Sequence, residues 1–300
     1  NNLVFGQEYG YQYLVDGTIR ISDPYTEKVL DPWNDQYIPE ETYPNLKPYP
    51  HDKTYGLVAV FQTNQEEYEW QTTNYTQPDL RDLVVYELLI RDFIEARNFQ
   101  TIIDTLPYLK KVGINAIEFM PINEFDGNLS WGYNPNHYFA VDKFYGTKNA
   151  FKALVDACHS MGMAVILDVV YNHATGVSPY CALYWDEANN RPAEDSPFYN
   201  EVAKHDFNVF NDMNHESAAT KAYIGRAFKF WIEEFKVDGY RLDLSKGFTQ
   251  KNTLGNTNEW GKYDQTRIDI LNQYADSAWS ANPDAYFILE HFAENSEEKD

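Results

Sequence analysis

Long hydrophobic runs are missing from this 300-residue sequence, and none approaches the roughly 20 apolar residues that a membrane-spanning helix needs. We therefore expect no membrane span. Basic residues are also scarce: 24 Lys and Arg stand against 46 Asp and Glu, for a net charge of -22. Such a charge repels phosphate backbones and anionic membrane surfaces, which excludes nucleic acid as an expected partner. The first residue is Asn1, so no signal segment can be read.

Cysteines are equally few. Cys158 and Cys181 lack metal-type spacing, and Cys158 falls on the apolar side of a predicted helix, which favours buried free thiols over a disulfide. No glycine-rich phosphate turn follows any predicted strand, which argues against a dinucleotide-binding fold. The cysteine-poor, acidic and aromatic composition favours an exported protein, with a cytoplasmic location as the alternative. The 24 tyrosines and 7 tryptophans suit either sugar stacking or a packed core.

The sequence pattern divides the chain at about residue 78. Residues 1–78 contain short β-rich pieces broken by turn residues, as in "YGYQYLVDG", "SDPY" and "YPNLKPYP". They predict a small antiparallel β-sandwich, complete or partial, that acts as a spacer or as a carbohydrate-binding module. Residues 79–300 alternate apolar runs with helical stripes, which predicts a second, larger α/β domain.

Five apolar runs in the second domain predict buried parallel strands: 83–90, 116–122, 164–170, 237–244 and 286–292. Apolar residues at helical spacing lie between them, and Gly162 is placed to end one of these helices. Acids at the strand ends favour a (β/α)8 barrel over a doubly wound sheet, because barrel sites gather residues from the carboxyl ends of several strands. Only five of eight strands are present, so we expect a barrel cut after the fifth.

Charged residues end three of the predicted strands. In "DGYRLDL" Arg241 and Asp243 share one face, since side chains alternate along a strand. Asp168 and Glu290 close the third and fifth strands in the same way. We expect Arg241 to lower the pKa of Asp243 and keep it ionised, as a nucleophile requires. A purely structural salt bridge is the alternative.

Three acids at neighbouring strand ends suit either a magnesium site or glycoside cleavage by two carboxyl groups. Arg241 would repel a divalent cation, and the amide of Asn172 and the ring of His173 could bind sugar hydroxyls, so we favour sugar chemistry. The aromatic loop 129–146 offers a stacking tyrosine. The long loop 174–215 ends near Asp212, Asn214 and His215, which we expect to cap a helix or to lie on a polar surface.

The motifs together resemble those of the α-amylase family of glycoside hydrolases. "DVVYNH", "GYRLDLSKG" and "ILEHF" are similar to its third-, fourth- and fifth-strand motifs, and "WGYNP" and "DMN" to two loop signatures. The likeness covers about residues 83–292. The amino-terminal part is similar to the immunoglobulin-like module of branching and debranching members.

The resemblance implies a retaining hydrolase of α-glucans such as starch or glycogen, with Asp243 as nucleophile, Glu290 as general acid/base and Arg241 orienting Asp243. Substrate-binding roles are implied for the following residues: His173, Tyr133, Asp168, Lys246 and Trp131. No cofactor is required, although Asn172 matches a position that binds structural calcium in many members.

Departures from the family pattern leave alternatives open. Gly247 stands where many members have a histidine whose carbonyl helps bind calcium, and the third catalytic aspartate has no counterpart. The resemblance thus implies that these 300 residues alone are inactive. An α-1,6 debranching enzyme, a branching transglycosylase and a non-catalytic amylase-like scaffold remain alternatives.

Overall fold

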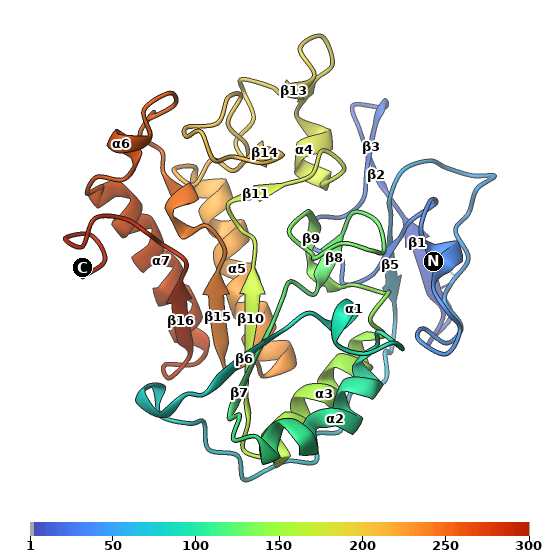
Figure 1. Cartoon of the computed structure of the whole chain (residues 1–300). Helices are drawn as coiled ribbons and strands as arrows, with labels where there is room; N and C mark the ends of the chain where they lie inside the picture. The colour runs from blue at the N-terminus through green and yellow to red at the C-terminus, as the bar shows by residue number, and fades with distance from the viewer. Residues whose placement is uncertain (1–2, 300) are drawn as a thin grey trace.

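Five parallel strands form the sheet that positions the candidate site, and they lie side by side in the order β16-β15-β10-β7-β6 (Figure 1). The computed structural model describes residues 3–299. Each predicted apolar run contains one of the five strands, so these five predictions are confirmed. The strands are β6 (Val85–Leu88), β7 (Ala116–Phe119), β10 (Ala164–Val169), β15 (Gly239–Leu242) and β16 (Tyr286–Leu289).

The spatial order of these strands equals their order along the chain. Each crossover therefore leads to the next neighbour in the same direction, which places the connecting helices on one face of the sheet. A doubly wound sheet would reverse direction once and cover both faces with helices. The described part of the sheet has the winding of a barrel wall and contains no such reversal.

Four long helices follow the predicted apolar stripes and connect these strands. The side chains of Asn98, Thr147, Ser217 and Asp264 accept backbone N–H groups at their first turns, which satisfies donors that the helix itself cannot. Gly162, at φ 64°, ends the second helix as predicted, because this left-handed backbone suits glycine. The helices are α2 (Phe99–Lys111), α3 (Lys148–Ser160), α5 (Ala218–Phe235) and α7 (Gln265–Ala281).

The two faces of the sheet differ in composition, as strand alternation requires. On the outer face Phe119, Leu167 and Tyr240 pack in the main core beneath the helices. The inner face carries a small apolar cluster that includes Ile166 and Tyr286, and above it the charged residues of the site.

Gly239 lies on the inner face and pairs with Tyr286 of the next strand. A Cβ at residue 239 would come within 2.4 Å of the Tyr286 carbonyl oxygen. Only glycine therefore fits between these two strands at their present spacing.

The first 78 residues contain antiparallel strands, as predicted. A three-stranded sheet has the order β1-β5-β4, and β2 pairs with β3 in a separate hairpin. Packing of two sheets into a sandwich, and likeness to an immunoglobulin module, stay predictions. The strands are β1 (Glu8–Tyr11), β2 (Tyr13–Val15), β3 (Ile19–Ile21), β4 (Val29–Leu30) and β5 (Val58–Gln62).

Short elements in the loops complete the described chain. Cys158 and Cys181 are buried free thiols, as predicted. Within residues 3–299, none of the helices combines the length and the apolar character that crossing a bilayer would take. The short elements are α1 (Ile90–Phe93), β8 (Asn123–Phe125), β9 (Pro135–Val141), β11 (His173–Ala174), α4 (Pro179–Leu183), β12 (Trp185–Asp186), β13 (Arg191–Pro192), β14 (Asn211–Asp212) and α6 (Thr257–Trp260), with 3-10 turns η1 (Asp35–Tyr37), η2 (Leu80–Asp82) and η3 (Ser245–Phe248).

Candidate active site

The guanidinium of Arg241 is the centre of the candidate site, and three carboxylates surround it. Its Nη1 lies 2.9 Å from Asp168 Oδ1 and 3.2 Å from Asp243 Oδ1, and its Nη2 lies 3.1 Å from Glu290 Oε2. The three acids predicted from the strand ends therefore do meet. Asp168 is fully buried, whereas Glu290 is partly exposed and accessible to a substrate.

The strand pairing explains why these groups meet. Asp168 of β10 pairs directly with Arg241 of β15, and Glu290 follows β16, the next strand in the sheet. The N–H of Leu244 donates to Glu290 Oε2 at 2.9 Å. Leu244 has a φ of 41°, a left-handed conformation that is strained for a residue with a Cβ. This backbone turn places one N–H donor on the carboxylate of the neighbouring strand.

Arg241 lowers the pKa of Asp243 as expected, but burial outweighs this effect and the net shift is upward. Burial raises the pKa of Asp243 above its usual value, and the opposing attraction of Arg241 reduces that rise without cancelling it. Burial likewise raises the pKa of Asp168 to about 7, against the Arg241 charge. The sequence indicated that Arg241 lies near Asp243, but it did not show how deeply Asp243 and Asp168 are buried.

Tyr133 and His173 lie beside the acid cluster. The Tyr133 hydroxyl donates to Asp168 Oδ2 at 2.6 Å, and His173 Nε2 lies 2.9 Å from the Tyr133 carbonyl oxygen. Burial lowers the pKa of His173 to about 4, so the ring is neutral at pH 7. Contact of Tyr133 and His173 with a sugar stays a prediction, while their bonds fix their positions at the site.

Asn172 links the site to the loops but does not present a free oxygen to a metal. Its side-chain nitrogen donates to the Asp243 carbonyl at 2.7 Å, and its side-chain oxygen contacts His173 Nδ1. His205 fills the neighbouring space, because a Cβ on Gly247 would lie 3.4 Å from its Nε2 and 3.2 Å from the Cβ of Asn172. A calcium ion at Asn172 would therefore have to compete with the contact between its side-chain oxygen and His173.

We predict that calcium does not stabilise this protein. A structural ion at about 1,000 times its dissociation constant would add about 4 kcal/mol to the free energy of unfolding, and chelation would remove it. We expect the same melting temperature in excess EDTA and in millimolar calcium, measured by circular dichroism. A fall of several degrees in EDTA that calcium reverses would contradict the prediction.

Trp131 and Lys246 differ sharply in accessibility. Trp131 is 57% exposed, so its ring is available to a ligand, whereas Lys246 is 8% exposed. The Lys246 ammonium donates to the Phe292 carbonyl at 2.9 Å and lies 3.9 Å from the centre of the Trp260 ring. Substrate contact by either residue stays a prediction, and for Lys246 these partners already occupy the ammonium.

Two expectations for the loop before α5 are wrong. Asp212 and His215 are buried, not part of a polar surface, with exposed fractions of 2% and 0%. Asp212 accepts from the Asn200 amide at 2.8 Å, and His215 Nδ1 lies 2.7 Å from the Tyr274 hydroxyl. The helix is capped by Ser217 instead. No local pattern marks this burial, because it depends on contacts with distant segments, such as Asn200 for Asp212 and Tyr274 of α7 for His215.

Sequence reasoning also missed two inward acids, Glu87 and Glu118. Their carboxylates lie within 4.8 Å of that of Asp168, a grouping that could bind a metal ion. Arg241 already supplies a cation to Asp168 at 2.9 Å, and its charge also acts on Glu118. Alternation along the second strand could have identified Glu118, since it points to the same face as Asp168.

Comparison with known sequences agrees with this geometry. Residues 95–209 match the model of the alpha amylase catalytic domain. The chain is 33% identical to a malto-oligosyltrehalose trehalohydrolase of Saccharolobus solfataricus over 78% of its own length and 36% of the relative's. It is 26% identical to the chloroplastic isoamylase 1 of Arabidopsis thaliana, over 82% of this chain and 36% of that one. The chain thus spans little more than a third of the relatives it matches.

Solved structures show the same fold at lower identity. The GBS pullulanase SAP in complex with maltotetraose superposes with a TM-score of 0.65 at 23% identity, over 94% of this chain and 37% of the other. The catalytic module of the glycogen-degrading pneumococcal virulence factor SpuA gives 0.65 at 22%, over 96% and 42%. These neighbours and the family imply a TIM-barrel catalytic domain. With its strand-end acids and the matched domain, the chain belongs to the α-amylase family of glycoside hydrolases, among relatives that include debranching and branching enzymes.

Proposed function

We propose that the protein cleaves α-glucans with retention of configuration, using Asp243 as nucleophile and Glu290 as general acid/base. One observation carries the proposal: carboxylates from two adjacent strands contact the same guanidinium, with Arg241 within 3.2 Å of Asp243 and 3.1 Å of Glu290. Retaining glycosidases place their two carboxyl groups about 5–5.5 Å apart, which adjacent strands readily provide.

The reaction would run in two displacements. An Asp243 oxygen attacks the anomeric carbon while the glycosidic C–O bond breaks, and the leaving oxygen takes the Glu290 proton. Water then attacks the same carbon, gives its proton to Glu290, and the bond to Asp243 breaks. A sugar hydroxyl in place of water would give transfer instead, which is the branching alternative.

Arg241 and Tyr133 would support this chemistry without reacting. Arg241 balances the charge of the three acids, and Tyr133 bonds Asp168 beside it. Asp168 and His173 would bind hydroxyls of the sugar at the cleavage position. Exposed Trp131 would stack against a neighbouring ring.

The names of the relatives support an α-glucan as substrate and leave the bond type open. They include a malto-oligosyltrehalose trehalohydrolase, an isoamylase and a 1,4-alpha-glucan branching enzyme of Shewanella frigidimarina. The product profile on amylose, amylopectin and pullulan separates α-1,4 cleavage, debranching and branching. A non-catalytic scaffold would give no product from any of them.

The nucleophile is tested by covalent trapping. A 5-fluoro-α-glucosyl fluoride forms a slowly hydrolysed ester with a retaining enzyme, because fluorine destabilises the oxocarbenium-like transition state. We expect mass spectrometry of the full-length protein to find the sugar on the peptide that contains Asp243. A β-anomer as the first product by NMR, or a label on another residue, would contradict the proposal; Asp243→Asn is the unlabelled control.

A further inference from the structure

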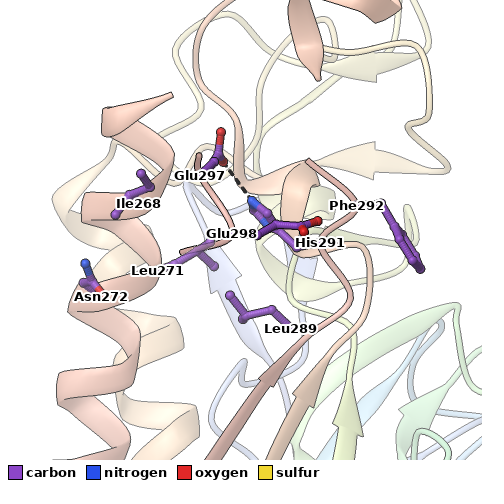
Figure 2. Close-up of a pocket in the computed structure, with 8 residues that line it drawn as sticks. All are labelled: Ile268, Leu271, Asn272, Leu289, His291, Phe292, Glu297 and Glu298. Atoms are coloured by element: carbon purple, nitrogen blue, oxygen red, sulfur yellow. Dashed lines mark hydrogen bonds and ion pairs between the residues drawn. The ribbon is translucent and has the colours of Figure 1, made fainter. Parts of the chain in front are cut away.

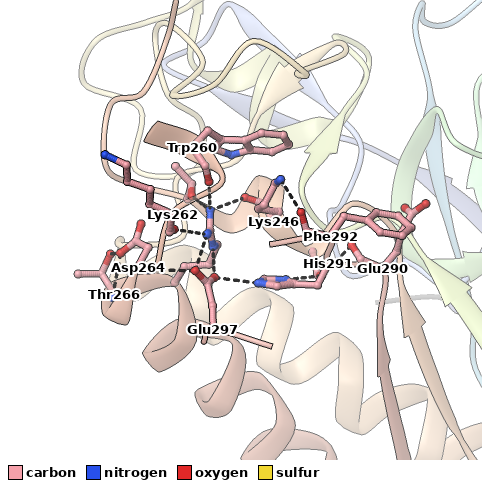
Figure 3. A network of polar contacts seen from close by, with 12 residues as sticks. Lys246, Trp260, Lys262, Asp264, Thr266, Glu290, His291, Phe292 and Glu297 are labelled. Carbon is pink, nitrogen blue, oxygen red and sulfur yellow. Dashed lines mark hydrogen bonds and ion pairs between the residues drawn. The ribbon is translucent and has the colours of Figure 1, made fainter. Parts of the chain in front are cut away.

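A buried polar network that includes His291 and Glu297 lies beside Glu290 (Figure 3). Its centre is the ion pair between Arg267 of α7 and Glu297, whose exposed fractions are 1% and 3%. Arg267 Nε lies 2.6 Å from Glu297 Oε1, and Nη2 lies 2.8 Å from Oε2. This bidentate geometry fixes the orientation of the Glu297 carboxylate.

The same carboxylate fixes His291, the residue after Glu290. His291 Nε2 lies 2.8 Å from Glu297 Oε1, and His291 Nδ1 lies 2.9 Å from the Ser245 hydroxyl. A neutral ring that donates through Nε2 to the carboxylate accepts from Ser245 through Nδ1. The carboxylate thus selects both the tautomer and the plane of the ring.

Ser245 connects the network to the Glu290 backbone. Its N–H donates to the Glu290 carbonyl at 3.0 Å. Its hydroxyl also lies 2.9 Å from that oxygen, but the single hydroxyl proton is directed to His291 Nδ1, so the N–H makes the bond to Glu290. Ser245 follows Leu244, whose N–H contacts the Glu290 carboxylate. Residues 244–245 therefore hydrogen-bond both the backbone and the carboxylate of Glu290. The Ser245 hydroxyl hydrogen-bonds the same segment to His291.

A hollow adjoins the network on the side of α7. Next to the network lies a cavity of about 480 Å³ between α7 and the end of the described chain, lined by His291, Glu297 and neighbouring residues (Figure 2). Neither Asp243 nor Glu290 lines it.

We propose that Glu297, oriented by Arg267, is a positioning residue that sets the proton-donating geometry of Glu290 through His291 and Ser245. The inference rests on the proposed function, because it assigns Glu297 to the acid step of that reaction. A purely structural role would lower activity equally on every substrate. A positioning role should lower activity most on substrates whose leaving group needs a proton.

The test compares two substrates in the full-length protein. A glucan needs Glu290 to protonate its leaving oxygen, whereas fluoride leaves α-maltosyl fluoride without a proton. For Glu297→Gln we expect kcat/KM on maltoheptaose to fall by about 10- to 100-fold, the order of loss from an ångström-scale misplacement. On the fluoride, kcat/KM reports only the attack of Asp243, and we expect it to change by less than about threefold.

The variants separate the possible outcomes. Glu298→Gln, an exposed neighbour on the same cavity, should behave as wild type. His291→Phe keeps an aromatic ring at this position and leaves the Arg267–Glu297 pair intact. It therefore tests the link from Glu297 to Glu290 if Glu297→Gln folds poorly. We expect it to show the same substrate dependence. Equal losses on both substrates would overturn the positioning role. A wild-type protein that turns over neither substrate would instead refute the proposed function itself.

Discussion

Replacing Asp243 with asparagine is expected to reduce kcat on α-glucans by about 10⁴-fold or more, the order of loss seen when a residue of a catalytic unit is removed. The amide has nearly the same shape but is too weak a nucleophile to form the glycosyl ester. We expect an equal loss on α-maltosyl fluoride, because attack on the anomeric carbon is needed whatever the leaving group. Initial rates of reducing-sugar and fluoride release measure the two losses.

Asp243→Asn is expected to lose activity without losing stability. Burial raises the pKa of Asp243, which means that its ionised form is disfavoured in the folded protein. Asp243→Asn removes that charge, so we expect a melting temperature at pH 8 no lower than that of wild type. Asp276→Asn, on the exposed side of α7, is the matched control for the exchange. Retention of most glucan turnover by Asp243→Asn would refute its role as nucleophile.

Replacing Arg241 with methionine is expected to lower the free energy of unfolding by about 3–5 kcal/mol at neutral pH, since buried carboxylates would lose their cation. Asp168 loses the most, because its side chain is fully buried and takes both contacts of 2.9 and 3.0 Å from Nη1. Urea unfolding measures the change. A similar value for wild type and variant would show that the ion pairs contribute little.

The destabilisation of Arg241→Met should grow with pH. In wild type the pKa of Asp168 is already raised from 3.8 to about 7, and loss of the Arg241 charge raises it further. A carboxyl group with a higher pKa in the folded state binds its proton more tightly there, so stability falls as pH rises above about 4 and through the folded value. We expect a smaller deficit at pH 5 than at pH 8. Asp168→Asn in the Arg241→Met background should restore part of the loss at pH 8.

The strands and helices of residues 79–300 could be predicted because their patterns are local. Apolar runs marked the five strands, and alternation within "DGYRLDL" placed Arg241 and Asp243 on one face before any partner was known. Their meeting with Asp168 and Glu290 followed from parallel strands that end at one edge of a sheet. These inferences needed only the periodic pattern of apolar and polar residues in the sequence.

The missed features depend on contacts between distant segments. The net pKa of Asp243 depends on the burial provided by other segments, and the burial of Asp212 depends on the course of a long loop. Arg267 carried a usable signal, since an arginine beside the apolar stripe of α7 needs a buried anion. Glu297, its partner, lies 30 residues further along, and nothing near it in sequence identifies the pairing.

The glycine at position 239 has a consequence for reaction stereochemistry. A methyl group there would collide with the backbone of β16 and push it away from β15. Asp243 directly follows one of these strands and Glu290 the other, so in the proposed mechanism a wider gap would admit a water molecule between Asp243 and the sugar. Whether the freed sugar keeps or inverts its anomeric configuration would then depend on the absence of a single carbon atom far below the bond being cut.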